Sequence, residues 1–264
     1  MGRKRELVPH GTVVHRITID ESLIRDAPNL RHLVAEDDPN TVVWLGPGSQ
    51  AVTYSLDGIF NIAFTRPWRP ATKGGGDDDD APFYGPQRRM FFEPEIDGEE
   101  TPWVRGVARF FCLVGDAAHQ TLPYLAQGAA MGLESSSVLS HLLGRARRND
   151  RGQIRAALGV YERMSKERSG WIIRASLENG RVWQLPDGPA QEERGRQLLA
   201  GGEGPGFPNM LADPDFREWL WGFDAAKAAG EAWEAYLSWE SGEIGRARGL
   251  LDGDEASSLV FSRI

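Results

Sequence analysis

The segment Leu113-Val-Gly-Asp-Ala-Ala-His119, followed by Gln-Thr-Leu-Pro123-Tyr-Leu-Ala-Gln127-Gly-Ala-Ala-Met-Gly-Leu-Glu134, decides the fold. An apolar run ends at a glycine and a carboxylate, as when a buried strand delivers a charged residue to the edge of a sheet. Pro123 and a Gln-Gly-Ala-Ala sequence then open a stretch with apolar residues at helical spacing. The amides of a helix start can hold an anionic group. This order of strand, acid, turn and helix predicts a ligand site.

The segment resembles the second flavin-binding motif of the FAD-dependent aromatic hydroxylases, the salicylate-hydroxylase-like monooxygenases. The family pattern is Gly-Asp-Ala-Ala-His, a proline, Gln-Gly or a close variant, alanine, and a helix carrying Glu-Asp; here Glu134 is followed by Ser135. The resemblance implies that Asp116 hydrogen-bonds a ribityl hydroxyl of FAD. It also implies that backbone amides face the pyrimidine edge of the flavin, where they stabilise the negative charge that develops on reduction. The implied FAD-binding residues are Gly115, Asp116, Pro123, Gln127, Gly128 and Ala129.

The resemblance covers residues 12 to 66 and 101 to 239, as strands of a substrate-side sheet and as carboxyl-terminal helices. On that sheet it places Arg16 and Tyr54 facing the flavin, where some relatives use an arginine and a tyrosine to bind and deprotonate a phenol. A nearby cation favours the phenolate, which is the better nucleophile. Gln50 stands where many relatives carry a histidine, the side chain best suited to accept a proton near neutral pH.

Two family features are missing from the sequence. Enzymes of this family begin with a strand, a Gly-x-Gly-x-x-Gly turn and a helix that holds the ADP pyrophosphate. Gly46-Pro-Gly48 lies between strand-like runs, and Gly202-Glu-Gly204-Pro-Gly206 leads into a Phe-Pro pair that cannot open such a helix. The family's Asp-Arg strand before the flavin motif is also absent. We therefore expect the carboxyl-terminal portion of a flavoprotein, without its amino-terminal dinucleotide-binding unit.

These patterns predict an α+β or α/β chain with a partial flavin-monooxygenase fold: a mixed substrate-side sheet, then the flavin-motif strand, then carboxyl-terminal helices. The expected divisions are a sheet region at 1–106 with an acidic loop at 67–100, the flavin motif at 107–145, a helical region at 146–241 and a mobile tail at 242–264.

Periodicity predicts individual elements inside those divisions. Residues 12 to 66 favour strands for the most part, residues 107 to 114 favour a strand, and residues 127 to about 145 favour a helix. A second long helical pattern runs from Ile154 and is expected to break near Asn179-Gly180, as at a helix cap. Trp219 to Trp239 predicts one last helix.

Composition narrows the function classes. The chain has 264 residues, of which 41% are hydrophobic and 26% charged, and its net charge is -8. This length and hydrophobic content suffice for one good core or two small ones. The negative charge argues against nucleic acid and anionic membranes as partners. The sequence shows no signal peptide and no run of about 20 apolar residues, so we expect a cytoplasmic chain that does not span a membrane. The single cysteine, Cys112, fits a reducing compartment and, in an apolar strand, is a poor nucleophile.

Several residues support ordinary interpretations better than chemical ones. The run Asp77 to Asp80 lacks the spacing of a calcium loop and favours a solvated linker, so no metal site is expected. His119 is expected to shape the motif turn rather than act as a general base. Six tryptophans at helical spacing are expected mostly in the core rather than against a substrate: Trp171, Trp183, Trp219, Trp221, Trp233 and Trp239.

The resemblance implies an FAD-dependent monooxygenase acting on a small aromatic or phenolic substrate. In that chemistry NAD(P)H reduces FAD, oxygen adds at the flavin C4a carbon, and the hydroperoxide oxygen passes to the ring. The alternative is a non-catalytic remnant or binding protein that does not hold FAD on its own. Because a βαβ unit normally packs on this half of the fold, we also expect an exposed apolar surface that promotes association.

Overall fold

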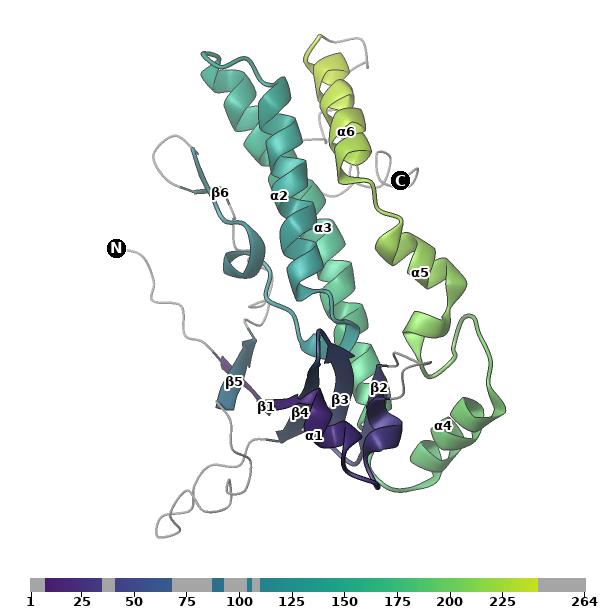
Figure 1. Ribbon diagram of the computed structural model, residues 1–264. Helices are drawn as coiled ribbons and strands as arrows, with labels where there is room; N and C mark the ends of the chain where they lie inside the picture. Colours follow the sequence, from purple (N-terminus) through teal and green to yellow (C-terminus); the bar gives the residue numbers. More distant parts are fainter. Residues whose placement is uncertain (1–7, 35–40, 68–86, 93–103, 106–109, 242–264) are drawn as a thin grey trace. The chain divides into compact units, whose positions relative to one another are not determined.

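The computed structural model describes residues 8–34, 41–67, 87–92, 104–105 and 110–241 (Figure 1). The chain divides into two compact units. The first comprises residues 1–94 and 178–212, and the second comprises residues 95–177 and 213–264. The solvated linker expected at 77–80 and the mobile tail expected at 242–264 lie outside the described residues.

The first unit is built on a five-stranded sheet, with strand order β2-β3-β4-β1-β5 and antiparallel pairing throughout. The strands are β1 (Val8–Asp20), β2 (Val42–Gly46), β3 (Ser49–Leu56), β4 (Ile59–Pro67) and β5 (Gln87–Phe92). Asp57 and Gly58 join β3 to β4 with φ angles of 50° and 76°. Positive φ at both central residues is what a tight hairpin turn requires, and it explains the Asp-Gly pair there.

Strand β5 corrects one prediction. The span from 67 to 100 was expected to be a loop, yet Gln87–Phe92 pairs with β1. Its sequence has no clear alternation of polar and apolar residues, so its strand conformation comes from pairing with β1 rather than from a local pattern.

One face of the sheet is covered by the short helix α1 (Glu21–Arg25) and the 3-10 turn η1 (Arg31–Val34). Ile24, Val34 and Phe60 are buried together there. Asp20 starts α1 by accepting a hydrogen bond from the Ser22 amide at 2.9 Å, which is ordinary N-capping.

The end of helix α3 (Arg151–Trp183) and helix α4 (Pro189–Ala200) complete the first unit. Trp183 is buried and its indole donates to the Pro208 carbonyl at 3.1 Å. The buried guanidinium of Arg194 donates to the carbonyls of Val182 and Trp183, at 3.1 and 2.6 Å. A cation at the carboxyl end of a helix satisfies carbonyls that lack partners within the helix.

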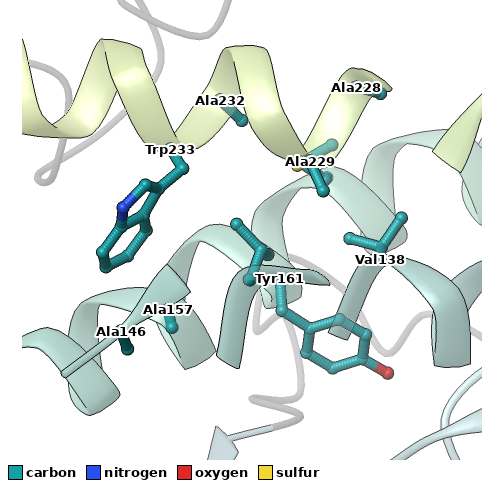
Figure 2. Close-up of a cluster of buried hydrophobic side chains, with 10 residues drawn as sticks. Val138, Ala146, Ala157, Tyr161, Ala228, Ala229, Ala232 and Trp233 are labelled. Carbon is teal, nitrogen blue, oxygen red and sulfur yellow. The ribbon is translucent and has the colours of Figure 1, made fainter. Parts of the chain in front are cut away.

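The second unit combines a small hairpin with a helical bundle. Strands β6 (Val104–Arg105) and β7 (Phe111–Cys112) pair with each other, and the helices are α2 (Gly128–Arg145), most of α3, α5 (Pro214–Trp221) and α6 (Ala225–Glu240). Ala228, Ala229 and Ala232 line the inner side of α6, so its backbone lies close to its neighbours. Trp233 and Tyr161 fill the remaining space (Figure 2).

Three predicted boundaries are wrong. The strand expected at 107–114 is only Phe111–Cys112 among the described residues. Helix α3 does not end at Asn179-Gly180 but continues to Trp183. Both residues are buried, and the Gln184 amide still bonds the Gly180 carbonyl at 3.0 Å, so packing outweighs the low helix propensity of Asn-Gly. The last helix is in fact two, α5 and α6.

The break between α5 and α6 has a local cause. Gly222 follows α5, and the Asp224 side chain then caps α6 by accepting from the Lys227 amide at 2.9 Å. An N-cap aspartate favours a new helix start over continuation of the old helix.

The tryptophans are divided, and the expectation that most are core is wrong for three of them. Trp183 and Trp233 are buried and Trp239 is half-buried, whereas Trp171, Trp219 and Trp221 are exposed. Two of the exposed rings lie against a guanidinium: Trp171 against Arg174, and Trp219 against Arg168. Helical spacing identifies a face, but it does not tell whether that face is covered.

Within the described residues, no helix combines the length and apolar character needed to cross a membrane. The same residues contain no group of three or more side chains that could bind a metal ion.

Candidate functional site

The motif turn lies in the second unit, directly after β7. Gly115–Ala117 form a 3-10 turn, η4, in which the amides of Ala118 and His119 donate to the Gly115 carbonyl at 2.8 and 2.9 Å. Gly115 has φ +62°, a conformation that glycine adopts without strain. The turn leaves the Asp116 carboxylate exposed, available to accept a hydrogen bond from a ligand hydroxyl.

Helix α2 begins a short distance further along the chain. Pro123–Leu125 form a second 3-10 turn, η5, and Ala126 is left-handed at φ 54°. Gln127, at the N-cap, is buried and donates to the Leu125 carbonyl at 3.3 Å, but its side chain makes no capping bond. The first turn also contains no acidic residue. The amides of Gly128 and Ala129 and the positive end of the helix dipole therefore suit an electron-rich acceptor.

The turn and the helix approach each other closely. A side chain added at Gly115 would meet the Gly132 Cα at 3.9 Å, and one added at Gly132 would meet the Gly115 Cα at 3.8 Å. Two glycines thus pack backbone against backbone, which holds the Asp116 turn next to helix α2.

His119 links the turn to α2 through a buried contact with Ser135. Its ring is buried, and Nε2 lies 3.1 Å from the Ser135 hydroxyl, which itself donates to the Gly132 carbonyl at 3.2 Å. Because the hydroxyl proton is used on Gly132, Nε2 carries a proton and donates to Ser135. Burial lowers the pKa of His119, although Asp116 and Glu134 act in the opposite direction. A buried, neutral histidine agrees with a role in shaping the turn.

Glu134, the acid of the motif helix, is paired with Arg168 of α3. The Nε and Nη2 atoms of Arg168 donate to the two carboxylate oxygens at 2.6 and 2.9 Å. Nη2 also donates to the Leu220 carbonyl at 2.8 Å, and the guanidinium lies 4.0 Å from the centre of the Phe223 ring. This contact was not foreseen, because nothing in the sequence links residues 134 and 168.

Arg16 and Tyr54 lie in the first unit, on β1 and β3. Arg16 pairs with Ala63 of β4, and Ala63 pairs in turn with Val52 of β3. Two residues after Val52, Tyr54 pairs with Asn61. Directly paired residues, and residues two apart on one strand, share a face. Arg16 and Tyr54 therefore lie on one face of the sheet, opposite the face that α1 covers. Arg16 is exposed and Tyr54 half-buried.

Gln50 lies on the same face as Arg16 and Tyr54, two residues before Val52 on β3. It is buried, and Gln184 Nε2 lies 3.4 Å from its Oε1. The Gln184 carbonyl also accepts from the Gly48 amide at 3.0 Å. Gln50 is therefore part of a packed amide contact at the β2–β3 turn.

The two buried histidines, His15 and His119, are expected to make the stability of the fold depend on pH. Burial lowers the pKa values of both His15 and His119 from 6.5, so between the folded pKa and 6.5 the unfolded chain binds more protons. Stability should be fully present above pH 6.5 and fall as the pH drops through that window. Urea denaturation at pH 7.5 and 5.5 checks this. His119→Gln should reduce the difference between the two pH values, and an unchanged difference would contradict the contribution of His119.

Comparison with known proteins identifies relatives across most of the chain. Over 254 residues it is 28% identical to the FAD-dependent monooxygenase OpS4 of Beauveria bassiana, covering 85% of this chain and 56% of that protein. It is 31% identical over 240 residues to the 3-amino-4-hydroxybenzoate 2-monooxygenase PtnB3 of Streptomyces platensis, covering 78% and 56%. A salicylate hydroxylase of Pseudomonas putida is 32% identical over 136 residues, covering 52% and 28%. No protein-family model matches the sequence.

Solved structures show the same fold. A salicylate hydroxylase in a substrate complex superposes with a TM-score of 0.61 at 20% identity, covering 86% of this chain and 58% of that one. CtdE in complex with FAD and a substrate gives a TM-score of 0.67 at 14% identity, covering 89% and 58%. The expected partial flavin-monooxygenase fold is confirmed, and the chain spans about half the length of the curated relatives it matches.

Proposed function

Because the chain belongs to the FAD-dependent aromatic monooxygenases, of which it spans about half, we propose that it binds the flavin end of FAD and takes part in hydroxylating a small aromatic or phenolic substrate. The observation that carries the proposal is the close packing of the turn that contains Asp116 against the first turns of α2. An exposed carboxylate and a helix start that lacks a side-chain cap lie on segments held together at Gly115 and Gly132.

The residues of this site fit a flavin. Asp116 would accept a hydrogen bond from a ribityl hydroxyl of FAD, and the amides of Gln127, Gly128 and Ala129 would stabilise negative charge on the flavin ring. Gly115 and Pro123 set the backbone of the two turns. FAD, when bound, accepts electrons from NAD(P)H and activates molecular oxygen.

A phenolic substrate is proposed to bind the sheet face that carries Arg16 and Tyr54. The positive charge of Arg16 favours ionisation of a phenol, and the Tyr54 hydroxyl is suited to bind the same oxygen. Gln50 cannot accept a proton near neutral pH, so we assign acceptance of the phenol proton to water rather than to Gln50.

The test is direct binding of flavins to the chain. The proposed contacts involve only the ribityl chain and the ring, which FAD and FMN share. Binding should therefore quench the fluorescence of both flavins, with dissociation constants within about fivefold of each other, a difference of roughly 1 kcal/mol. Flavin absorbance should remain with the chain after rapid desalting.

Two results would count against the proposal. Absence of any flavin binding would favour the alternative, a binding protein that does not hold FAD alone. Binding of FAD but not FMN would show that the ADP end is recognised by residues other than those assigned here.

A further inference from the structure

The motif loop, defined as residues 113–122, carries Asp116 between β7 and η5, and the role given to it below rests on the proposed function. A loop positions a ligand-binding carboxylate only if its own backbone is held in place. Its two ends are bonded to side chains of one helix, α3.

The first attachment is at the start of the motif loop. The Tyr161 hydroxyl donates to the Leu113 carbonyl at 2.7 Å, and the Tyr161 side chain is fully buried in the bundle core. Burial raises the pKa of Tyr161 far above its usual value, so the hydroxyl keeps its proton and remains a donor.

The second attachment is at the end of the motif loop. The Ser176 hydroxyl donates to the Leu122 carbonyl at 2.8 Å, and Ser176 is also fully buried. Leu122 precedes Pro123, and a residue before proline is restricted to extended conformations. This bond therefore holds the point at which the chain turns toward the start of α2.

The two donors belong to one rigid element. Tyr161 and Ser176 are 15 residues apart on α3, close to four helical turns, so they lie on nearly the same side of the helix. Between the two ends, His119 is bonded to Ser135 of α2. The middle of the motif loop is therefore fixed to α2, while its two ends are fixed to α3.

We propose that Tyr161 and Ser176 are positioning residues: they fix both ends of the motif loop to α3 and thereby hold the Asp116 carboxylate in place beside the start of α2. Neither side chain is assigned a contact with flavin or substrate. Both act through the backbone carbonyls of Leu113 and Leu122.

The experiment compares Tyr161→Phe and Ser176→Ala with two matched controls. Tyr236→Phe removes a tyrosine hydroxyl that donates to Glu240 within α6, and Ser169→Ala removes a buried serine hydroxyl that donates to Lys166 within α3. Hydrogen–deuterium exchange of peptides covering 113–122 is followed in the chain without flavin. A lost buried hydrogen bond should accelerate exchange at the motif loop roughly tenfold, while the controls change it less than about twofold.

Ser176→Thr retains a hydroxyl and should return exchange toward the parent rate. Unchanged exchange at 113–122 in both test variants overturns the proposal. So does equal acceleration across α2, α3 and α6, because that would mean general loss of stability. FAD titration of the same variants separates the two proposals: if the parent binds FAD, both test variants should bind it about three- to tenfold more weakly. A parent that binds no flavin refutes the proposed function alone, since exchange still decides whether the loop is held.

Discussion

Replacing Arg168 with alanine is expected to lower the free energy of unfolding by about 3 kcal/mol, because removing one partner of a buried ion pair leaves the other charge uncompensated. The side chains of Arg168 and Glu134 are 12% and 21% exposed. The expected loss therefore lies at the lower end of the free-energy losses caused by removing one partner of a buried ion pair. The loss also includes the hydrogen bond to the Leu220 carbonyl and the contact with the Phe223 ring. Urea denaturation of parent and variant measures the difference.

Arg174→Ala is the matched control for Arg168→Ala. Arg174 is on the same helix and its guanidinium also lies over an aromatic ring, Trp171, at 4.8 Å, but it is exposed and has no ion pair among the described residues. Its loss should cost less than about 1 kcal/mol. Equal effects of the two replacements would contradict the view that the Glu134–Arg168 pair joins α2, α3 and the end of α5.

Replacing Asp116 with alanine is expected to weaken FAD binding about ten- to a hundredfold. The variant removes a hydrogen bond to a charged acceptor, worth about 1.5 to 3 kcal/mol. Asp116 is exposed, so the free energy of unfolding should change little. Asp116→Asn keeps an uncharged acceptor and should fall between parent and alanine variant. Fluorescence titration measures the affinities, and equal affinity of parent and alanine variant would refute the assignment of Asp116.

Ala129→Asp provides a second test at the start of α2, with opposite effects on helix and ligand. A carboxylate in the first turn of a helix stabilises it by about 0.3 to 1 kcal/mol. The same charge beside the pyrimidine edge of the flavin should weaken the binding of oxidised FAD on the order of tenfold. The weakening should be larger for reduced FAD, which carries more negative charge there. Ala129→Asn has nearly the same shape without the charge and is the control. Equal affinity of the Asp and Asn variants would show that the flavin ring lies elsewhere.

The motif segment shows which parts of the candidate site can be predicted from local sequence. Gly115 requires positive φ, Pro123 begins a turn, and the apolar spacing after Gln127 predicts a helix at 127–145, which the structure places at Gly128–Arg145. These features depend on interactions within a few residues. The family resemblance drawn from the same residues is confirmed by the relatives.

Other elements depended on tertiary contacts. Asn179-Gly180 has the composition of a helix end, yet α3 continues through it because both residues and Trp183 are buried in the first unit. Strand β5 exists through pairing with β1 rather than through its own alternation. In both cases packing or pairing outweighs a preference worth about 1 kcal/mol.

The sequence by itself therefore determined the order of strand, turn and helix and the candidate flavin residues, whereas the face shared by Arg16 and Tyr54 followed only from the strand pairing. The tertiary structure alone decided which distant side chains hold that site: Arg168 with Glu134, Tyr161 with the Leu113 carbonyl, and Ser176 with the Leu122 carbonyl. The physical reason is that backbone conformation is encoded by neighbouring residues, whereas a hydrogen bond between groups 34 to 54 positions apart forms only after helices have packed.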